Sequence, residues 1–139
     1  MTREAQLWDY LRKSCFPPGT HLSRIESETA PGFPDVHYTY AGSSGTIELK
    51  SSKSPVPTIP FTQKRGLRQS QLEWIADECE AGGNVWVCLK CGPTIYLIKG
   101  SKAKFINGAT ESDLKVFSSY YWTVGQNPKT IRKNLGIIL

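Results

Sequence analysis

Three charged residues have types and spacing that could support chemistry. Asp35 stands just before a predicted strand, and Glu48 and Lys50 lie two residues apart on the next one. Two neighbouring carboxylates repel each other unless a cation separates them, and a hard divalent ion with oxygen ligands suits that role. We therefore expect Asp35 and Glu48 to hold Mg²⁺, which Mn²⁺ should be able to replace. Such an ion would activate a water and offset charge on a phosphodiester, while Lys50 orients the water.

The same residues also have a structural interpretation. A Glu and a Lys two residues apart on a strand often form a solvent-exposed ion pair that contributes little. Short matches to Pro-Asp followed by Glu-x-Lys also occur by chance. The wider context of the sequence has to decide between the two interpretations.

The elements that must position these residues form a predicted hairpin. Two runs of alternating polarity flank a Gly-Ser-Ser-Gly loop at residues 42–45, which pairs Ala41 with Thr46. In this register the two carboxylates and the lysine share one face of the hairpin. We expect that face to be polar and exposed to solvent, and the other face to lie in the core.

Hydrophobic periodicity and turn residues predict further elements in the order α-β-β-α-β-β-α. This order indicates an α/β fold in which helices cover a small mixed sheet. The length fits one domain, residues 1–139, with a core over 1–100 and a C-terminal helix and basic tail over 101–139. The expected elements are a helix over 3–14, strands over 36–40 and 46–50, a helix that Ser70 caps with Glu73, strands over 84–91 and 94–99, and a helix over 111–121.

The composition excludes several classes of protein. Hydrophobic content of 39% and charged content of 21% exclude a disordered or fibrous chain. No apolar run approaches the ~20 residues of a membrane span, and the N-terminus lacks the apolar region of a signal peptide. We therefore expect a cytoplasmic protein. The net charge of +5 favours a polyanionic partner such as DNA.

The four cysteines are expected to be reduced thiols, because an intracellular chain of this size rarely carries disulfides. Cys88 and Cys91 have the spacing of a zinc knuckle. A structural zinc needs four ligands, however, and no second pair follows. Buried free thiols are the better interpretation.

With these observations in place, the chain resembles the PD-(D/E)XK nuclease superfamily, and within it the VRR-NUC and Holliday-junction-resolvase-like members. Pro34-Asp35 matches the PD half of the motif, and Glu48-Leu49-Lys50 matches the E-x-K half. The resemblance covers residues 1–98. It rests on the segments 32–35, 48–50, 67–74 and 81–87.

The resemblance implies a restriction-endonuclease-like core and metal-dependent hydrolysis of DNA phosphodiesters. It implies that the carbonyl of Leu49 joins Asp35 and Glu48 as a metal ligand, and that Lys50 assists the water. It also places Gln71 at a glutamine that often lines such sites. The alternative for Gln71 is a solvated residue of the first helical turn.

One further acid is expected near the metal. Glu4 matches a first-helix glutamate that members of this group often direct toward the ion. The alternative is a partly exposed acid favoured at a helix start by the helix dipole. Glu26 or Glu28 could supply the acid instead, and the sequence does not rank the three.

Basic residues near the Glu48 strand are expected to contact DNA phosphates, with solvated loop charges as the alternative. Because no additional domain is present to read sequence, we expect a preference for branched or distorted DNA. A two-fold homodimer would suit the cutting of two strands. The expected DNA-binding residues are Lys53, Lys64, Arg65 and Arg68.

Two other functions remain open. A nickase or single-strand nuclease would use the same three charged residues. A catalytically silent DNA-binding module would keep the fold, although an intact Asp35, Glu48 and Lys50 set argues against it. A small stand-alone nuclease would also fit a phage product that acts in the host cytoplasm.

Overall fold

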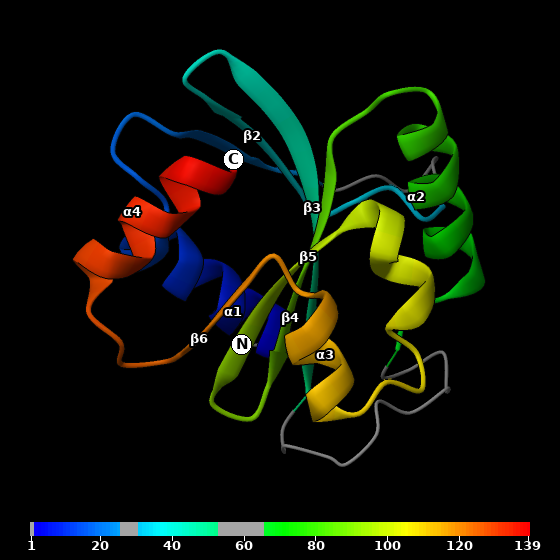
Figure 1. Ribbon diagram of the computed structural model, residues 1–139. Helices are drawn as coiled ribbons and strands as arrows, with labels where there is room; N and C mark the ends of the chain where they lie inside the picture. Colours follow the sequence, from blue (N-terminus) through cyan, green and yellow to red (C-terminus); the bar gives the residue numbers. More distant parts are fainter. Residues whose placement is uncertain (1, 26–30, 53–65) are drawn as a thin grey trace.

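The computed structural model describes residues 2–25, 31–52 and 66–139. Its elements in chain order are α1 (Arg3–Tyr10), η1 (Leu11–Cys15), β1 (His21–Arg24), β2 (Val36–Tyr40), β3 (Ser43–Ser52), α2 (Gln69–Glu80), β4 (Val85–Cys91), β5 (Thr94–Lys99), η2 (Gly100–Phe105), α3 (Glu111–Phe117), β6 (Tyr120–Thr123) and α4 (Pro128–Ile138). A six-stranded sheet runs through the middle of the molecule, with α1 and α4 on one face and α2, η2 and α3 on the other (Figure 1). The predicted α/β class, a mixed sheet flanked by helices, is thereby confirmed.

The strands follow sequence order across the sheet, from β1 at one edge to β6 at the other. Neighbouring strands pair antiparallel except β3 and β4, which are parallel. A parallel pair needs a crossover connection, and α2 lies in that crossover. The carboxyl ends of β3 and β4 therefore meet at the same end of the sheet.

Both faces of the central strands are buried. Along β4, Trp86 and Cys88 belong to the hydrophobic cluster under α1 and α4. The intervening Val87 and Leu89 belong to the cluster under α2, η2 and α3. Because side chains alternate along a strand, a strand covered on both faces is apolar on both, as this one is from Val85 to Leu89.

The β2–β3 hairpin has a tighter turn than predicted. Tyr40 pairs with Ser43, which leaves only Ala41 and Gly42 in the turn. Both have positive φ, 50° and 84°, as in two-residue turns whose twist matches that of the strands. The predicted four-residue loop and its pairing of Ala41 with Thr46 are wrong. The predicted faces survive because the register differs by an even number of residues.

The predicted helix over 111–121 is too long. α3 ends at Phe117, and Tyr120–Thr123 adds β6 to the sheet. Trp122 pairs with Ile95 of β5 and is 2% exposed. Burial of this large side chain through strand pairing outweighs the helical spacing of the apolar residues before it.

The basic C-terminal segment forms a helix, α4, where only a tail was predicted. The Asn127 side chain accepts a hydrogen bond from the Lys129 N–H, and Pro128 occupies the first turn. Ile131 and Leu135, four residues apart, are buried in the cluster shared with α1. This spacing gives α4 one apolar face and leaves its basic residues outside.

Three smaller differences concern helix ends and an edge strand. The helix predicted over 3–14 is present, but its last turn, η1, is a π-helix. β1 was not predicted and forms the edge of the sheet beside β2. Ser70 does not cap α2, because the Gln71 side chain accepts the Arg68 N–H at 2.9 Å and the helix begins at Gln69.

All four cysteines are free thiols, as predicted. Cys88 lies in the cluster under α1, whereas Cys91 lies in the cluster under α2. The two thiols therefore face opposite sides of the sheet and do not share a zinc ion. None of the helices in the described ranges is long and apolar enough to cross a membrane.

Candidate active site

Asp35 lies immediately before β2, and the register of β2 on β3 places it opposite Glu48. The Leu49 N–H donates a hydrogen bond to Oδ2 of Asp35 at 2.8 Å. This contact holds the Asp35 carboxylate beside β3. The predicted hairpin register would have set Asp35 opposite Ser52, so the two-residue turn is what brings the two carboxylates together.

Glu48 is buried rather than solvated. It is 3% exposed, because α2 covers this face of the sheet. Nε2 of Gln71 donates a hydrogen bond to Oε1 of Glu48 at 2.6 Å, and Gln71 is itself 3% exposed. The expected solvent-exposed polar face is therefore wrong, as are the interpretations of Gln71 as a solvated residue and of Glu48 as part of a surface ion pair.

The second oxygen of the Glu48 carboxylate, Oε2, is buried and has no hydrogen-bond partner within the described part of the chain. A buried carboxylate oxygen without a donor costs free energy, and native proteins rarely keep one without a reason. The Asp35 carboxyl is close enough to share a proton with Glu48. When both groups are ionised, neither has a proton to give. Either a shared proton or a cation resolves this arrangement.

The pKa of Glu48 reflects its burial beside the second carboxyl group. Burial, followed by the negative charge of Asp35, raises the pKa of Glu48 from an ordinary 4.5 to about 9. The positive charges of Lys50 and Arg68 act in the opposite direction on this pKa. Lys50 and Arg68 are thus electrostatically coupled to the centre. In the metal-free protein the acid pair retains a proton at neutral pH.

The loop before Asp35 is held against the start of α2. Gly32 has a φ of +85°, and a Cβ at this residue would lie 2.1 Å from the carbonyl oxygen of Ser70. Next to it, the Phe33 ring packs edge-on against Trp74, with ring centroids 4.8 Å apart. The loop and the helix that supply Asp35 and Gln71 are thereby fixed to each other. Sequence reasoning missed this positioning role, although the Gly-Phe-Pro-Asp run and Trp74 carried the signal.

The remaining predicted metal ligands are distributed as follows. Glu4 lies in the first turn of α1. Over the described ranges, no three His, Cys, Asp or Glu side chains gather where they could hold a metal ion, so Glu4 does not complete a three-acid group with Asp35 and Glu48. Glu26 and Glu28 lie outside the described residues.

Of the predicted DNA-binding residues, the structure describes Arg68 alone. It is exposed at the N-terminus of α2, next to the Gln71 that holds Glu48. Lys53, Lys64 and Arg65 lie outside the described residues.

The donor set at the centre fits a hard divalent cation. Mg²⁺ in proteins is usually held by one or two carboxylates and completes its octahedron with waters and substrate oxygens. Asp35 and Glu48 provide two carboxylates, and Oε2 of Glu48 lacks any other partner in the described segments. Asp35 and Glu48 would hold such an ion without a third acid.

Comparison with solved structures identifies the fold. The chain is similar to Hjc, a Holliday junction resolvase from the archaeal hyperthermophile Archaeoglobus fulgidus, with a TM-score of 0.58 over 99% of this chain and 100% of that one. The two sequences are 17% identical, so the similarity is one of fold. No protein-family model matches the chain, and no curated protein matches it in sequence. The mixed sheet with helices on both faces thus has the fold of that resolvase.

Proposed function

We propose that the chain is a metal-dependent nuclease that hydrolyses phosphodiester bonds of DNA at the Asp35–Glu48 centre. The observation that carries this proposal is the buried, unpartnered Oε2 of Glu48 beside a second carboxyl within the described residues. Strongly perturbed acids cluster at functional sites because catalysis needs them there. The resolvase fold and the net charge of +5 support DNA as the substrate.

In this proposal the protein fixes one oxygen of each carboxylate and leaves the other for the ion. The Leu49 N–H holds Oδ2 of Asp35, and Gln71 holds Oε1 of Glu48. The carbonyl of Leu49 would be a further ligand. When bound, Mg²⁺ supplies positive charge against the negative charge that develops on the phosphodiester.

Two cations complete the proposed centre. The positive charge of Lys50 lowers the pKa of Glu48, which supports a role in which its ammonium orients a water or a phosphate oxygen. Arg68 is exposed at the N-terminus of α2 and would contact a neighbouring phosphate of the DNA backbone.

We infer that the preferred substrate is branched or distorted DNA, as expected of a nuclease in the VRR-NUC and Holliday-junction-resolvase-like group. The fold of the resolvase supports this substrate class. A two-fold homodimer would present two centres to the two strands of a branched substrate.

The proposal is tested by incubating the purified protein with supercoiled plasmid in Mg²⁺, in Mn²⁺ and in EDTA. Cleavage should require the divalent ion. Lys50→Ala should slow cleavage by about 100-fold or more, the range lost with a group that assists proton transfer. Lys99→Ala, which removes the same charge from an exposed position on β5, is the matched control. Cleavage that is undiminished in EDTA would overturn the metal mechanism, and an undiminished rate for Lys50→Ala would overturn the role of Lys50.

The substrate class is tested in the same assay with a four-way junction, a flap and a linear duplex of equal length. A structure-specific nuclease should cut the branched substrates at least tenfold faster than the duplex. Equal rates on all three would contradict recognition of DNA structure. A preference for single strands would instead assign the chain as a single-strand nuclease.

A further inference from the structure

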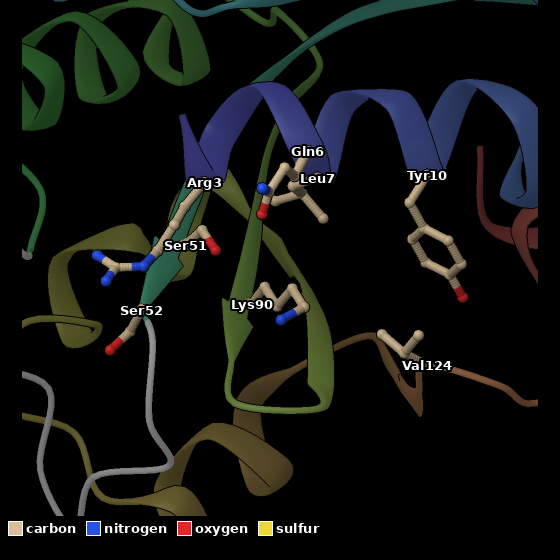
Figure 2. A pocket seen from close by; sticks show the side chains of 8 residues that line it. All are labelled: Arg3, Gln6, Leu7, Tyr10, Ser51, Ser52, Lys90 and Val124. Atoms are coloured by element: carbon tan, nitrogen blue, oxygen red, sulfur yellow. The ribbon is translucent and has the colours of Figure 1, made fainter. Parts of the chain in front are cut away.

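A pocket of about 300 Å³ opens between α1 and the carboxyl ends of β3 and β4 (Figure 2). Ser51 of β3 pairs with Lys90 of β4 at this point, one residue beyond the pair formed by Lys50 and Leu89. Because side chains alternate along a strand, Lys50 shares the face that Glu48 presents to α2, and Ser51 faces α1. The pocket therefore lies at the same end of the sheet as Lys50 but on the opposite face.

The lining of the pocket changes from polar to apolar along its length. One cationic side chain and two hydroxyl groups lie at one end, a second cation lies near the middle, and an aromatic ring and an apolar side chain lie at the other end (Figure 2). From the polar to the apolar end, the residues are Arg3, Ser51 and Ser52, then Lys90 near the middle, then Tyr10 and Val124.

The positive charge in the pocket is not neutralised by the protein that the structure describes. In those residues the ion pairs are those of Asp9 with Arg12 and Lys13, so no described carboxylate pairs with Arg3 or Lys90. None of the described lining residues is acidic.

Lys90 is also preoriented. Its Nζ donates a hydrogen bond to the carbonyl oxygen of Gly92 at 2.6 Å, which fixes the ammonium and leaves two of its protons for another acceptor. Two cations and two hydroxyl groups that line one pocket are typical partners of a phosphate.

The other end of the pocket offers a fixed apolar wall. Nε1 of Trp122 donates a hydrogen bond to the Tyr10 hydroxyl at 3.1 Å, which holds the Tyr10 ring in place. The bases of unpaired nucleic acid stack on aromatic side chains of this kind and pack against apolar ones, and they do so whatever the sequence. The volume lies at the lower end of the ~300–1,000 Å³ of ligand pockets. It is sufficient for one nucleotide and too small for a base pair.

We propose that this pocket receives one unpaired nucleotide of the DNA substrate, with its phosphate between Arg3 and Lys90 and its base against Tyr10 and Val124. A DNA strand that crosses the carboxyl end of β3 would reach both this pocket and Lys50, which lies next to Ser51. The inference rests on the proposed nuclease function. It adds a specific feature of the substrate, an unpaired nucleotide beside the bond that is cut.

The test measures binding of a fluorescent single-stranded oligonucleotide and of the matching duplex in EDTA, where cleavage does not interfere. Lys90→Gln and Arg3→Gln should each weaken single-strand binding by about tenfold, the usual cost of losing a charged hydrogen bond. Each should also lower the slope of log affinity against log salt by about 0.7, as for one lost phosphate contact on a single strand. Lys102→Gln, an exposed lysine of η2 outside the pocket, is the matched control and should change neither quantity.

Arg3 is exposed, so its replacement leaves the fold intact and provides the second variant if Lys90→Gln unfolds. Duplex binding should fall by less than twofold in both variants. Equal losses for duplex and single strand would overturn the proposal, because the pocket would then be a general phosphate contact. Equal losses in the Lys102→Gln control would also overturn it.

The base end is tested separately by following backbone amide resonances of Ser51 and Ser52 during titration with thymidine 5′-monophosphate, inorganic phosphate or thymidine. The nucleotide should bind at least tenfold more tightly than inorganic phosphate. Val124→Glu, at a residue that is 42% exposed, should remove most of that difference. Equal affinity for nucleotide and phosphate would leave the base without a site and contradict the proposal.

These measurements do not depend on catalysis. Absence of metal-dependent cleavage with intact nucleotide binding would contradict the nuclease function and not the pocket. Metal-dependent cleavage with no binding at the pocket would contradict the pocket alone.

Discussion

Gln71 of α2 donates a hydrogen bond to Glu48 of β3 at 2.6 Å, while its carbonyl oxygen accepts the Arg68 N–H at 2.9 Å. One amide therefore satisfies both a backbone group at the start of the helix and a buried carboxylate of the sheet. Both Gln71 and Glu48 are 3% exposed, so water does not substitute for either contact. The position of α2 and the orientation of the Glu48 carboxylate are coupled through this side chain.

Replacing Gln71 should remove both the hydrogen bond at the start of α2 and the hydrogen bond to Glu48. Gln71→Leu leaves Oε1 of Glu48 and the Arg68 N–H without their partner, which should lower the free energy of unfolding by about 1–3 kcal/mol. The affinity for Mn²⁺ should fall by about tenfold or more, as when a group that orients a metal ligand is removed. Calorimetric titration with Mn²⁺ and thermal unfolding in EDTA measure the two effects. Gln69→Leu, at the exposed neighbouring position, is the control; a Gln71→Leu protein with unchanged Mn²⁺ affinity would contradict the role of Gln71.

The pKa of Glu48, raised to about 9, predicts how stability depends on pH without metal. Folded Glu48 keeps its proton between pH 4.5 and 9, whereas the unfolded chain releases it near pH 4.5. The unfolded state thus binds fewer protons in this window, so stability falls as pH rises through it, by at most about 1.4 kcal/mol per pH unit.

The matching variant is Glu48→Gln, which cannot ionise. In EDTA it should be more stable than the unmodified protein at pH 8, and the difference should shrink toward pH 5. Saturating Mg²⁺ should remove most of the pH dependence of the unmodified protein, because the cation takes the place of the proton. Chemical unfolding at several pH values checks this. A Glu48→Gln protein less stable than the unmodified one at pH 8 would contradict the raised pKa.

Much of the site followed from alternation along strands. The spacing of Glu48 and Lys50 placed both on one face, and the register parity put Asp35 on the same face, even though the predicted turn was wrong. The turn itself was missed because Gly-Ser-Ser-Gly is a stronger loop signal than Ala41-Gly42. Ser43 and Ser44 instead pair with Tyr40 and Thr39 and extend β3 to the turn.

The burial of the site could not be predicted from a short stretch of sequence. From sequence alone the Glu48 side chain is expected to be exposed to solvent, because acidic side chains are rarely buried. Its burial depends on α2, whose approach depends on Gly32 and on the Phe33–Trp74 contact between residues 41 positions apart in the chain. Likewise, Tyr120 and Tyr121 were assigned to a helix because their strand partners, Leu97 and Tyr96, lie far away in sequence.

The C-terminal helix should contribute substantially to the stability of the fold. Leu135 is 2% exposed and lies in the cluster under α1 and α4, whereas Ile137 on the same helix is 74% exposed. Leu135→Ala should lower the free energy of unfolding by about 2–5 kcal/mol, and Ile137→Ala by less than about 0.5 kcal/mol. Urea unfolding of the two variants makes the comparison. Equal, small effects would mean that the segment over 128–138 does not belong to the core.

Gly32 should be the most sensitive glycine near the site, because two independent costs meet there. A side chain at its φ of +85° costs about 1–2 kcal/mol in backbone strain. A Cβ only 2.1 Å from the Ser70 oxygen must also push the loop from α2, at about 1–3 kcal/mol more. Gly19 has a similar φ of +88° with no described atom within 4 Å of a Cβ, so Gly19→Ala carries the strain without the collision. Gly32→Ala should therefore be less stable than Gly19→Ala by about 1–3 kcal/mol. Of the two variants, only Gly32→Ala should weaken Mn²⁺ binding, because displacement of the loop moves Asp35 away from Glu48. Equal stability losses with unchanged Mn²⁺ affinity would show that the approach of the loop to α2 does not position Asp35.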